Sequence, residues 1–160
     1  MKAVIDLGSN TFNLLIADIK NNQLNVAVNL EFPVKIGKGG LVNNFITESA
    51  MQRALTALSQ FKSYIDQFEI FEIKALATSA IRNASNGNEL IHKVKQLFDI
   101  DIAIINGIVE AEYIYLGANN SYNLPKDEVL VMDIGGGSVE FIIGRNDNIL
   151  WKQGFDIGAV

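Results

Sequence analysis

Two short segments of the chain have the composition of phosphate-binding turns. They are DLGSNT at residues 6–11 and DIGGGS at residues 133–138, and each lies between two apolar, β-rich runs. Glycine has no Cβ and can adopt positive φ angles, so main-chain N–H groups at such a turn can approach an oxyanion closely. The aspartate before each turn would repel a phosphate and is better suited to hold a divalent cation. Each segment therefore predicts a phosphate site with a cation site beside it.

The two segments are copies at a constant offset of 127 positions (133 minus 6), and the register holds without a gap. The aligned pairs are Asp6 with Asp133, Gly8 with Gly135 and Thr11 with Ser138. Solenoid units repeat at roughly 20 to 50 residues, so this longer interval indicates a duplicated domain. One copy alone is also compatible with a tight hairpin whose aspartate caps its own turn. Two copies in register favour a phosphorylated ligand gripped by two hairpins.

Alternation of apolar residues and turn composition predict the elements around the first segment. A three-stranded meander is expected over residues 2–8, 12–19 and 24–32. Thr47 is suited to cap a helix over 48–67, whose apolar stripe would contain Met51, Leu55, Leu58 and Ile65. A strand over 71–78, a helix over 88–98, a strand over 101–107 and a helix over 108–118 follow. The last helix would have Val109, Tyr113 and Leu116 on one side.

The second segment lies in another predicted meander. Its strands are expected over residues 129–134, 139–144 and 149–155, after a loop-like stretch, NNSYNLPKDE. The chain therefore reads βββαβαβα followed by a second βββ, which is an α/β pattern. The domain boundary is predicted at residue 122, with domain I over 1–122 and the start of a second domain over 123–160.

Composition restricts the classes of partner. The chain has 13 basic and 18 acidic side chains and a net charge of −5, which argues against a broad surface for nucleic acid or anionic lipid. It has no cysteine, which excludes disulfides and thiolate metal sites. No apolar run approaches the roughly 18 residues that a membrane helix needs, and the first residues do not resemble a signal peptide. A cytoplasmic protein without a membrane partner is therefore expected.

Four motifs in order resemble the exopolyphosphatase/guanosine-pentaphosphatase (Ppx/GppA) family of the actin, Hsp70 and sugar-kinase superfamily. They are AVIDLGSNTFNLLIADI, ALATSAIRNASN, INGIVEAEYIYLGA and VLVMDIGGGSVEFIIG. The resemblance implies RNase-H-like domains and metal-assisted attack of water on a terminal phosphoryl group, with Mg²⁺ or another divalent cation as cofactor. Members of the family are longer than this chain, which resembles their N-terminal portion.

The resemblance also implies roles for individual residues. Glu110 matches a general base and Arg82 an arginine that faces phosphate oxygens. The phosphate loops correspond to Gly8, Ser9 and Asn10 and to Gly135, Gly136, Gly137 and Ser138. The cation ligands would come from Asp133, Asp6 and Glu140.

Each catalytic residue also has a structural interpretation. Glu110 is expected in the first turn of a helix, where a carboxylate stabilises the helix dipole. Arg82 follows a strand in a polar stretch, where a solvated surface residue is common. His92 is expected to face solvent and has no assigned role.

The chain departs from the family pattern next to Glu110. Where the family commonly has Ser-Gly-x-Glu-Glu-Ala-Arg, this chain has Val109 in place of the first glutamate and Glu112 in place of the arginine. The loss of a positive charge affects the expected preference for long polyphosphate.

The expected activity is hydrolysis of terminal phosphoanhydride bonds in polyphosphate or guanosine pentaphosphate. A kinase-like member of the superfamily, acting on sugar or acetate, and a non-catalytic phosphate- or nucleotide-binding module are the alternatives. The second meander would have an apolar face and an open edge, so homodimerisation or other self-association is also expected. Weak or no turnover by this chain alone is expected as well.

Overall fold

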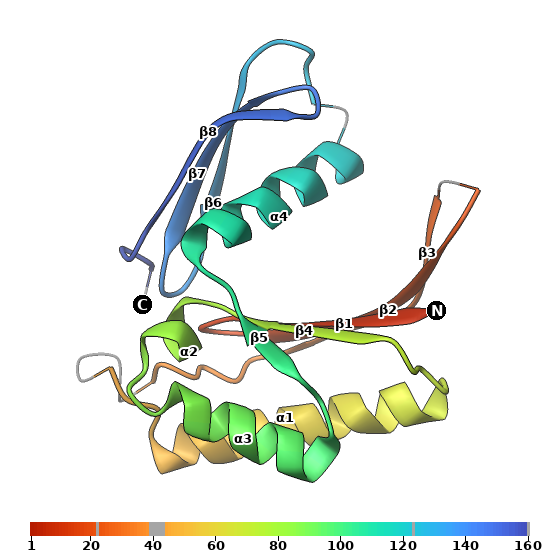
Figure 1. The fold of residues 1–160 in the computed structure, drawn as a ribbon, viewed down its shortest axis with the longest axis vertical. Coiled ribbons are helices and arrows are strands. Elements are labelled where there is room, and N and C mark those ends of the chain that lie inside the picture. Colours follow the sequence, from red (N-terminus) through yellow and green to blue (C-terminus); the bar gives the residue numbers. More distant parts are fainter. Residues whose placement is uncertain (22, 39–43, 123, 160) are drawn as a thin grey trace. The chain divides into compact units, whose positions relative to one another are not determined.

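The computed structural model describes residues 1–21, 23–38, 44–122 and 124–159. The chain divides into two compact units, Met1–Ile104 and Ile105–Val160, called here the N-terminal and the C-terminal unit (Figure 1). Each unit has its own sheet and its own apolar core. Among the described residues, no helix has both the length and the hydrophobicity that crossing a membrane requires.

The N-terminal unit contains a five-stranded sheet in the order β3-β2-β1-β4-β5. Its strands are β1 (Lys2–Leu7), β2 (Phe12–Lys20), β3 (Gln23–Phe32), β4 (Ile73–Ala77) and β5 (Ile102–Ile104). The first three strands pair antiparallel, whereas β4 pairs parallel with both β1 and β5. The helices are α1 (Glu48–Gln67), α2 (Ser79–Asn83) and α3 (Gly87–Phe98).

Helices α1 and α3 cover one face of this sheet (Figure 1). Alternate strand residues point into that core, namely Ala3, Ile5 and Leu7 of β1 and Phe12, Leu14 and Ile16 of β2. The predicted stripe of α1 is confirmed, because Met51, Leu58 and Ile65 are buried and Leu55 is partly buried against the same core. Thr47 caps this helix as expected, since its hydroxyl accepts a hydrogen bond from the Ala50 N–H.

The C-terminal unit contains helix α4 (Gly107–Ser121) and a three-stranded antiparallel sheet of β6 (Val129–Ile134), β7 (Val139–Arg145) and β8 (Asn148–Phe155). Helix α4 packs on one face of this sheet through Ala111 and Tyr115. The Tyr115 hydroxyl donates a hydrogen bond to the Asn146 carbonyl at 2.8 Å. On the other face, Leu130, Met132 and Ile134 are exposed.

Two features of the helices differ from the predictions. The short helix α2 was not predicted, because five residues are too few to show a helical period. In α4, the side with Tyr113 and Leu116 is not the one that packs on the sheet: these two residues are exposed, and Ala111 and Tyr115 are buried. Apolar residues surround most of this helix, so its sequence could not show which side the sheet would cover.

Helix α4 belongs by its packing to the C-terminal unit, although the sequence pattern assigns it to the first repeat. The compact units meet at residues 104 and 105, before α4. This division describes packing, whereas the predicted boundary at residue 122 concerns the duplicated sequence and stays a prediction.

Candidate functional site

The first glycine turn joins β1 to β2. The Gly8 N–H donates to the Thr11 carbonyl at 3.0 Å, which closes the turn. A Cβ at residue 8 would lie 2.9 Å from that same carbonyl oxygen, closer than Cβ atoms normally come to other atoms. Glycine is therefore required here by the close approach of two stretches of main chain.

The second glycine turn joins β6 to β7 and has the same construction. The Gly135 N–H donates to the Ser138 carbonyl at 2.9 Å, and a Cβ at residue 135 would lie 3.0 Å from the Ser138 oxygen. The tight turns that the sequence predicted are thus present in both copies, each closed by the same hydrogen bond. Their role in binding phosphate stays a prediction.

The aspartates before the two turns have different partners across the hairpin. Asp6 lies opposite Asn13, whose Nδ2 donates to Asp6 Oδ2 at 3.3 Å. Asp133 lies opposite Glu140, so two carboxylates occupy directly opposed positions on one face of the sheet. Asp133 is exposed, whereas Glu140 is only 1% exposed. Like charges at opposed positions destabilise a β-hairpin, and a divalent cation beside them would remove that repulsion.

The parallel pairing of β1 with β4 brings α2 beside the first turn. Both strands end at the same edge of the sheet, and the Thr78 N–H donates to the Leu7 carbonyl at 3.3 Å. Ser9 and Ser79 are both buried, and their hydroxyl oxygens are 3.0 Å apart. Ser79 thus joins the first turn to the helix that carries Arg82, a role that the sequence analysis missed. A small polar residue directly after a strand that pairs with β1 is the signal that could have shown it.

Arg82 lies in α2 and is partly buried. Its main-chain N–H donates to the Thr78 carbonyl at 2.9 Å. Gly87 packs against this helix so closely that a Cβ would lie 2.2 Å from the Ile81 carbonyl oxygen. This close contact restricts the main chain of α2, from which the Arg82 side chain projects.

Glu110 lies in the first turn of α4, as predicted, and is partly buried. Asn106 caps this helix, because its Oδ1 accepts a hydrogen bond from the Val109 N–H at 2.9 Å. A Cβ at Gly154 would lie 3.3 Å from Gly107 Cα and 3.4 Å from Glu140 Oε1. The start of α4 and the Glu140 carboxylate therefore adjoin the same point of β8.

Glu112, which replaces an arginine of the family pattern, forms an ion pair with Lys152 of β8. Both partners are at least partly exposed, so the pair adds little to stability. The lysine neutralises the Glu112 carboxylate on this side of the helix.

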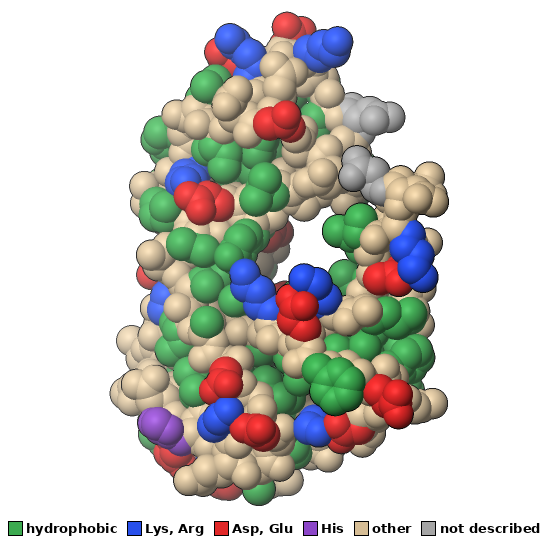
Figure 2. All heavy atoms as spheres, turned by 45° about the vertical axis from the view of Figure 1, so that its right-hand side comes forward, with side chains coloured by type: hydrophobic (Ala, Val, Ile, Leu, Met, Phe, Trp, Pro, Cys, Tyr) green, Lys and Arg blue, Asp and Glu red, His purple; other side chains and the backbone are tan. Residues whose placement is uncertain are grey.

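The histidine and the remaining acidic side chains are further groups that could bind a cation. His92 is exposed on α3, as expected. Over the described ranges, no three His, Cys, Asp or Glu side chains gather as a metal cluster. Figure 2 shows acidic and basic side chains interspersed over the face that it presents.

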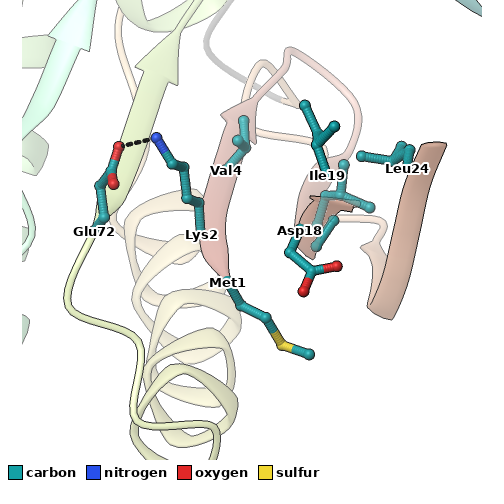
Figure 3. A pocket seen from close by; sticks show the side chains of 9 residues that line it. Met1, Lys2, Val4, Asp18, Ile19, Leu24 and Glu72 are labelled. Atoms are coloured by element: carbon teal, nitrogen blue, oxygen red, sulfur yellow. Dashed lines mark ion pairs between the residues drawn. The ribbon is translucent and has the colours of Figure 1, made fainter. Parts of the chain in front are cut away.

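An apolar groove lies at the other end of β1 from the first turn (Figure 3). It is lined by Met1, Lys2, Val4, Leu15, Ala17, Asp18, Ile19, Leu24 and Glu72. Lys2 and Glu72 pair with each other at 2.7 Å. The Lys20 ammonium hydrogen-bonded to Asp18 holds the pKa of that carboxyl below its usual range. Because its charges are paired and its walls are apolar, this groove is not suited to a phosphate.

Comparison with known proteins identifies the family. The profile of the Ppx/GppA phosphatase family matches residues 15–160. The chain belongs to the Ppx/GppA phosphatase family. This confirms the resemblance found in the four sequence motifs.

Named relatives of this Ppx/GppA chain include two curated proteins. It is 36% identical over 168 aligned positions to a bifunctional 3-dehydroquinate synthase/phosphatase of Fusobacterium nucleatum, covering 100% of this chain and 25% of that protein. It is 32% identical to a guanosine-5'-triphosphate,3'-diphosphate pyrophosphatase of Pseudoalteromonas translucida, covering 99% of this chain and 32% of that protein. The chain thus spans less than half of each relative.

Solved structures confirm the predicted fold class. An exopolyphosphatase of Cytophaga hutchinsonii superposes with a TM-score of 0.94 at 47% identity, over 98% of this chain and 50% of that one. A protein of Bacteroides thetaiotaomicron with an actin-like ATPase fold superposes with a TM-score of 0.56 at 9% identity, which shows the fold alone.

Proposed function

We propose that this chain is the phosphate-gripping part of a hydrolase that releases terminal phosphate from polyphosphate or guanosine pentaphosphate. The observation that carries the proposal is the repeated turn, closed by the same hydrogen bond after Asp6 and after Asp133. Turns of this kind direct main-chain N–H groups toward an anion, and a longer phosphate chain needs several such donors. The names of the relatives, an exopolyphosphatase and a guanosine-5'-triphosphate,3'-diphosphate pyrophosphatase, support this substrate class.

The donor set of the C-terminal unit fits a divalent cation. Mg²⁺ is usually held by one or two carboxylates together with water and substrate phosphates, and Asp133 and Glu140 supply two opposed carboxylates. Asp6 is the weaker candidate, because its opposed residue is an amide. A bound cation would supply positive charge to the oxygens of the transferring phosphoryl group.

The residues of the chain then have separate tasks in hydrolysis. The amides of residues 9–11 and 136–138 hold phosphate oxygens, Gly136 and Gly137 have no Cβ to obstruct close approach, and Arg82 binds the oxygens through its planar guanidinium. Glu110 takes a proton from water as the water oxygen bonds to the terminal phosphorus. The bond from that phosphorus to the bridging oxygen breaks, and its electron pair leaves with the shortened phosphate chain.

The decisive test is Glu110→Gln. Because the chain covers half of the C. hutchinsonii exopolyphosphatase, turnover is measured in a chimera in which this chain replaces the matching half. We expect phosphate release to fall roughly a hundred- to ten-thousand-fold, the usual share of a general base, while binding survives. Glu112→Gln, on the same helix, is the matched control and should change release far less. If the chimera released phosphate at the same rate with and without Glu110→Gln, the mechanism would be refuted.

The binding site can be tested in this chain itself. Inorganic tripolyphosphate with Mg²⁺ should shift the amide NMR signals of residues 8–11 and 135–138. If tripolyphosphate shifted the amide signals of neither turn, the proposed function would be overturned.

A cytoplasmic location and self-association remain predictions from the sequence. The exposed Leu130, Met132 and Ile134 support self-association.

A further inference from the structure

The main chain of residues 34–36 runs beside the first glycine turn and binds its carbonyl groups. The Lys35 N–H donates to the Asn10 carbonyl at 2.7 Å, and the Ile36 N–H donates to the Ser9 carbonyl at 2.9 Å. In a trans peptide, the C=O of one residue and the N–H of the next point in opposite directions. No cis peptide occurs in the described part of the chain. The N–H groups of Asn10 and Thr11 are therefore directed away from residues 34–36.

The Arg53 side chain of α1 donates hydrogen bonds to two main-chain carbonyl groups of this segment. Its Nε donates to the Val34 carbonyl at 2.7 Å, and its Nη2 donates to the Lys35 carbonyl at 2.9 Å. The planar guanidinium suits two neighbouring acceptors, and charge-assisted hydrogen bonds of this kind are stronger than neutral ones. One side chain thus fixes two successive peptide groups.

The backbone at Lys35 needs such support. Its φ angle is 49°, a left-handed value that non-glycine residues seldom adopt. Its N–H is bound to the Asn10 carbonyl, and its own carbonyl accepts from Arg53 and, at 3.1 Å, from the Lys38 N–H, so both sides of the strained residue are engaged. A change at Arg53 would remove the guanidinium from both the Val34 and the Lys35 carbonyl, leaving the second with the Lys38 N–H, and would loosen the peptide group between these residues.

Buried apolar side chains also attach residues 34–36 and α1 to the core, and these contacts do not involve the Arg53 guanidinium. Val34 and Ile36 are 3% and 1% exposed and belong to the core of the N-terminal unit. On α1, Ala50, Ala54 and Ala57 are buried against that core. Loss of the guanidinium should therefore change the orientation of the peptide groups of residues 34–36 more than the packing of this segment on the core.

We infer that Arg53 is a positioning residue for the first phosphate turn. It acts through Lys35, which sets the direction of the Asn10 and Thr11 amides, and it does not itself touch the phosphate. The inference rests on the proposed function, since it assumes that these amides bind phosphate oxygens.

The test compares three variants of the ¹⁵N-labelled chain titrated with inorganic tripolyphosphate and Mg²⁺. Arg53→Ala should weaken binding about tenfold and shift the Asn10 and Thr11 amide signals before ligand is added. It should also speed hydrogen exchange at the Lys35 amide. The single ammonium group of Arg53→Lys can bond to one carbonyl more easily than to both. This variant should therefore bind tripolyphosphate more tightly than Arg53→Ala and less tightly than the wild type. Gln52→Ala, an exposed neighbour on α1, should match the wild type.

The outcomes separate the inference from the proposed function. Wild-type affinity and unmoved Asn10 and Thr11 signals in folded Arg53→Ala would overturn the inference alone. Absence of any tripolyphosphate-induced shift in the wild type would overturn the proposed function. If Arg53→Ala does not fold, the folded Arg53→Lys variant replaces it, and wild-type affinity despite a displaced Lys35 amide signal would overturn the inference.

Discussion

The β1–β2 hairpin of the N-terminal unit and the β6–β7 hairpin of the C-terminal unit pair their strands in the same register. Asp6 opposes Asn13 and Asp133 opposes Glu140, which keeps the offset of 127 positions (140 minus 13). A β-bulge follows in each unit, between Ile16 and Ala17 and between Ile143 and Gly144. The repeat thus extends from the sequence to details of the main chain.

The two hairpins nevertheless bury opposite faces. In the N-terminal unit, α1 and α3 cover the face that contains Ile5, which is fully buried. At the corresponding position of the C-terminal unit, Met132 is 53% exposed. There, α4 covers the face of Val131 and Ile142, whose counterparts Val4 and Leu15 line the groove of Figure 3. A repeated hairpin therefore preserves its turn, while the helices around it decide which face is buried.

Gly144→Ala should have the largest effect on stability and tests the difference between the covered faces. A Cβ at residue 144 would lie 2.1 Å from Tyr115 Cζ, so we expect the C-terminal unit to lose about 3 kcal/mol by overpacking. The corresponding residue of the N-terminal unit is Ala17, which accommodates its methyl group at 8% exposure. Denaturant unfolding followed by the fluorescence of Trp151, the chain's single tryptophan, measures the loss. Unfolding of Gly144→Ala at the wild-type midpoint would refute this packing.

Exchanging the residues opposite the two aspartates should have a smaller effect than Gly144→Ala. Glu140→Asn should weaken Mn²⁺ binding by about tenfold in calorimetry, because one of two opposed carboxylates is lost. Asn13→Glu should destabilise the metal-free N-terminal unit by about 0.5–1 kcal/mol through repulsion with Asp6, and Mn²⁺ should restore the loss. If Glu140→Asn and the wild type bound Mn²⁺ with equal affinity, the proposed cation site at Asp133 and Glu140 would be refuted.

Gly8→Ala and Gly135→Ala should have effects of similar size to each other. Each added Cβ would lie about as close to the carbonyl that closes its turn, at 2.9 Å and 3.0 Å, so we expect a loss of about 1 kcal/mol for each. Melting temperatures of the two variants and the wild type measure it. A loss confined to one glycine would show that the turns are not equivalent.

The sequence by itself determined the features that depend on local chemistry. The duplicated turns followed from glycine and aspartate at matching positions, the Thr47 cap from a hydroxyl before an amphipathic run, and the family from four ordered motifs. In each case the residue type restricts its own backbone or its immediate neighbours, so the information lies within a few positions of the chain.

Only the tertiary structure decided which distant groups meet. Ser9 meets Ser79 because β1 and β4 pair in parallel, and Arg53 reaches residues 34 and 35 because α1 packs beside that segment. The buried side of α4 was likewise undetermined, because a helix that is apolar on most sides can pack by any of them. These contacts depend on the packing of whole elements, which no short stretch of sequence specifies.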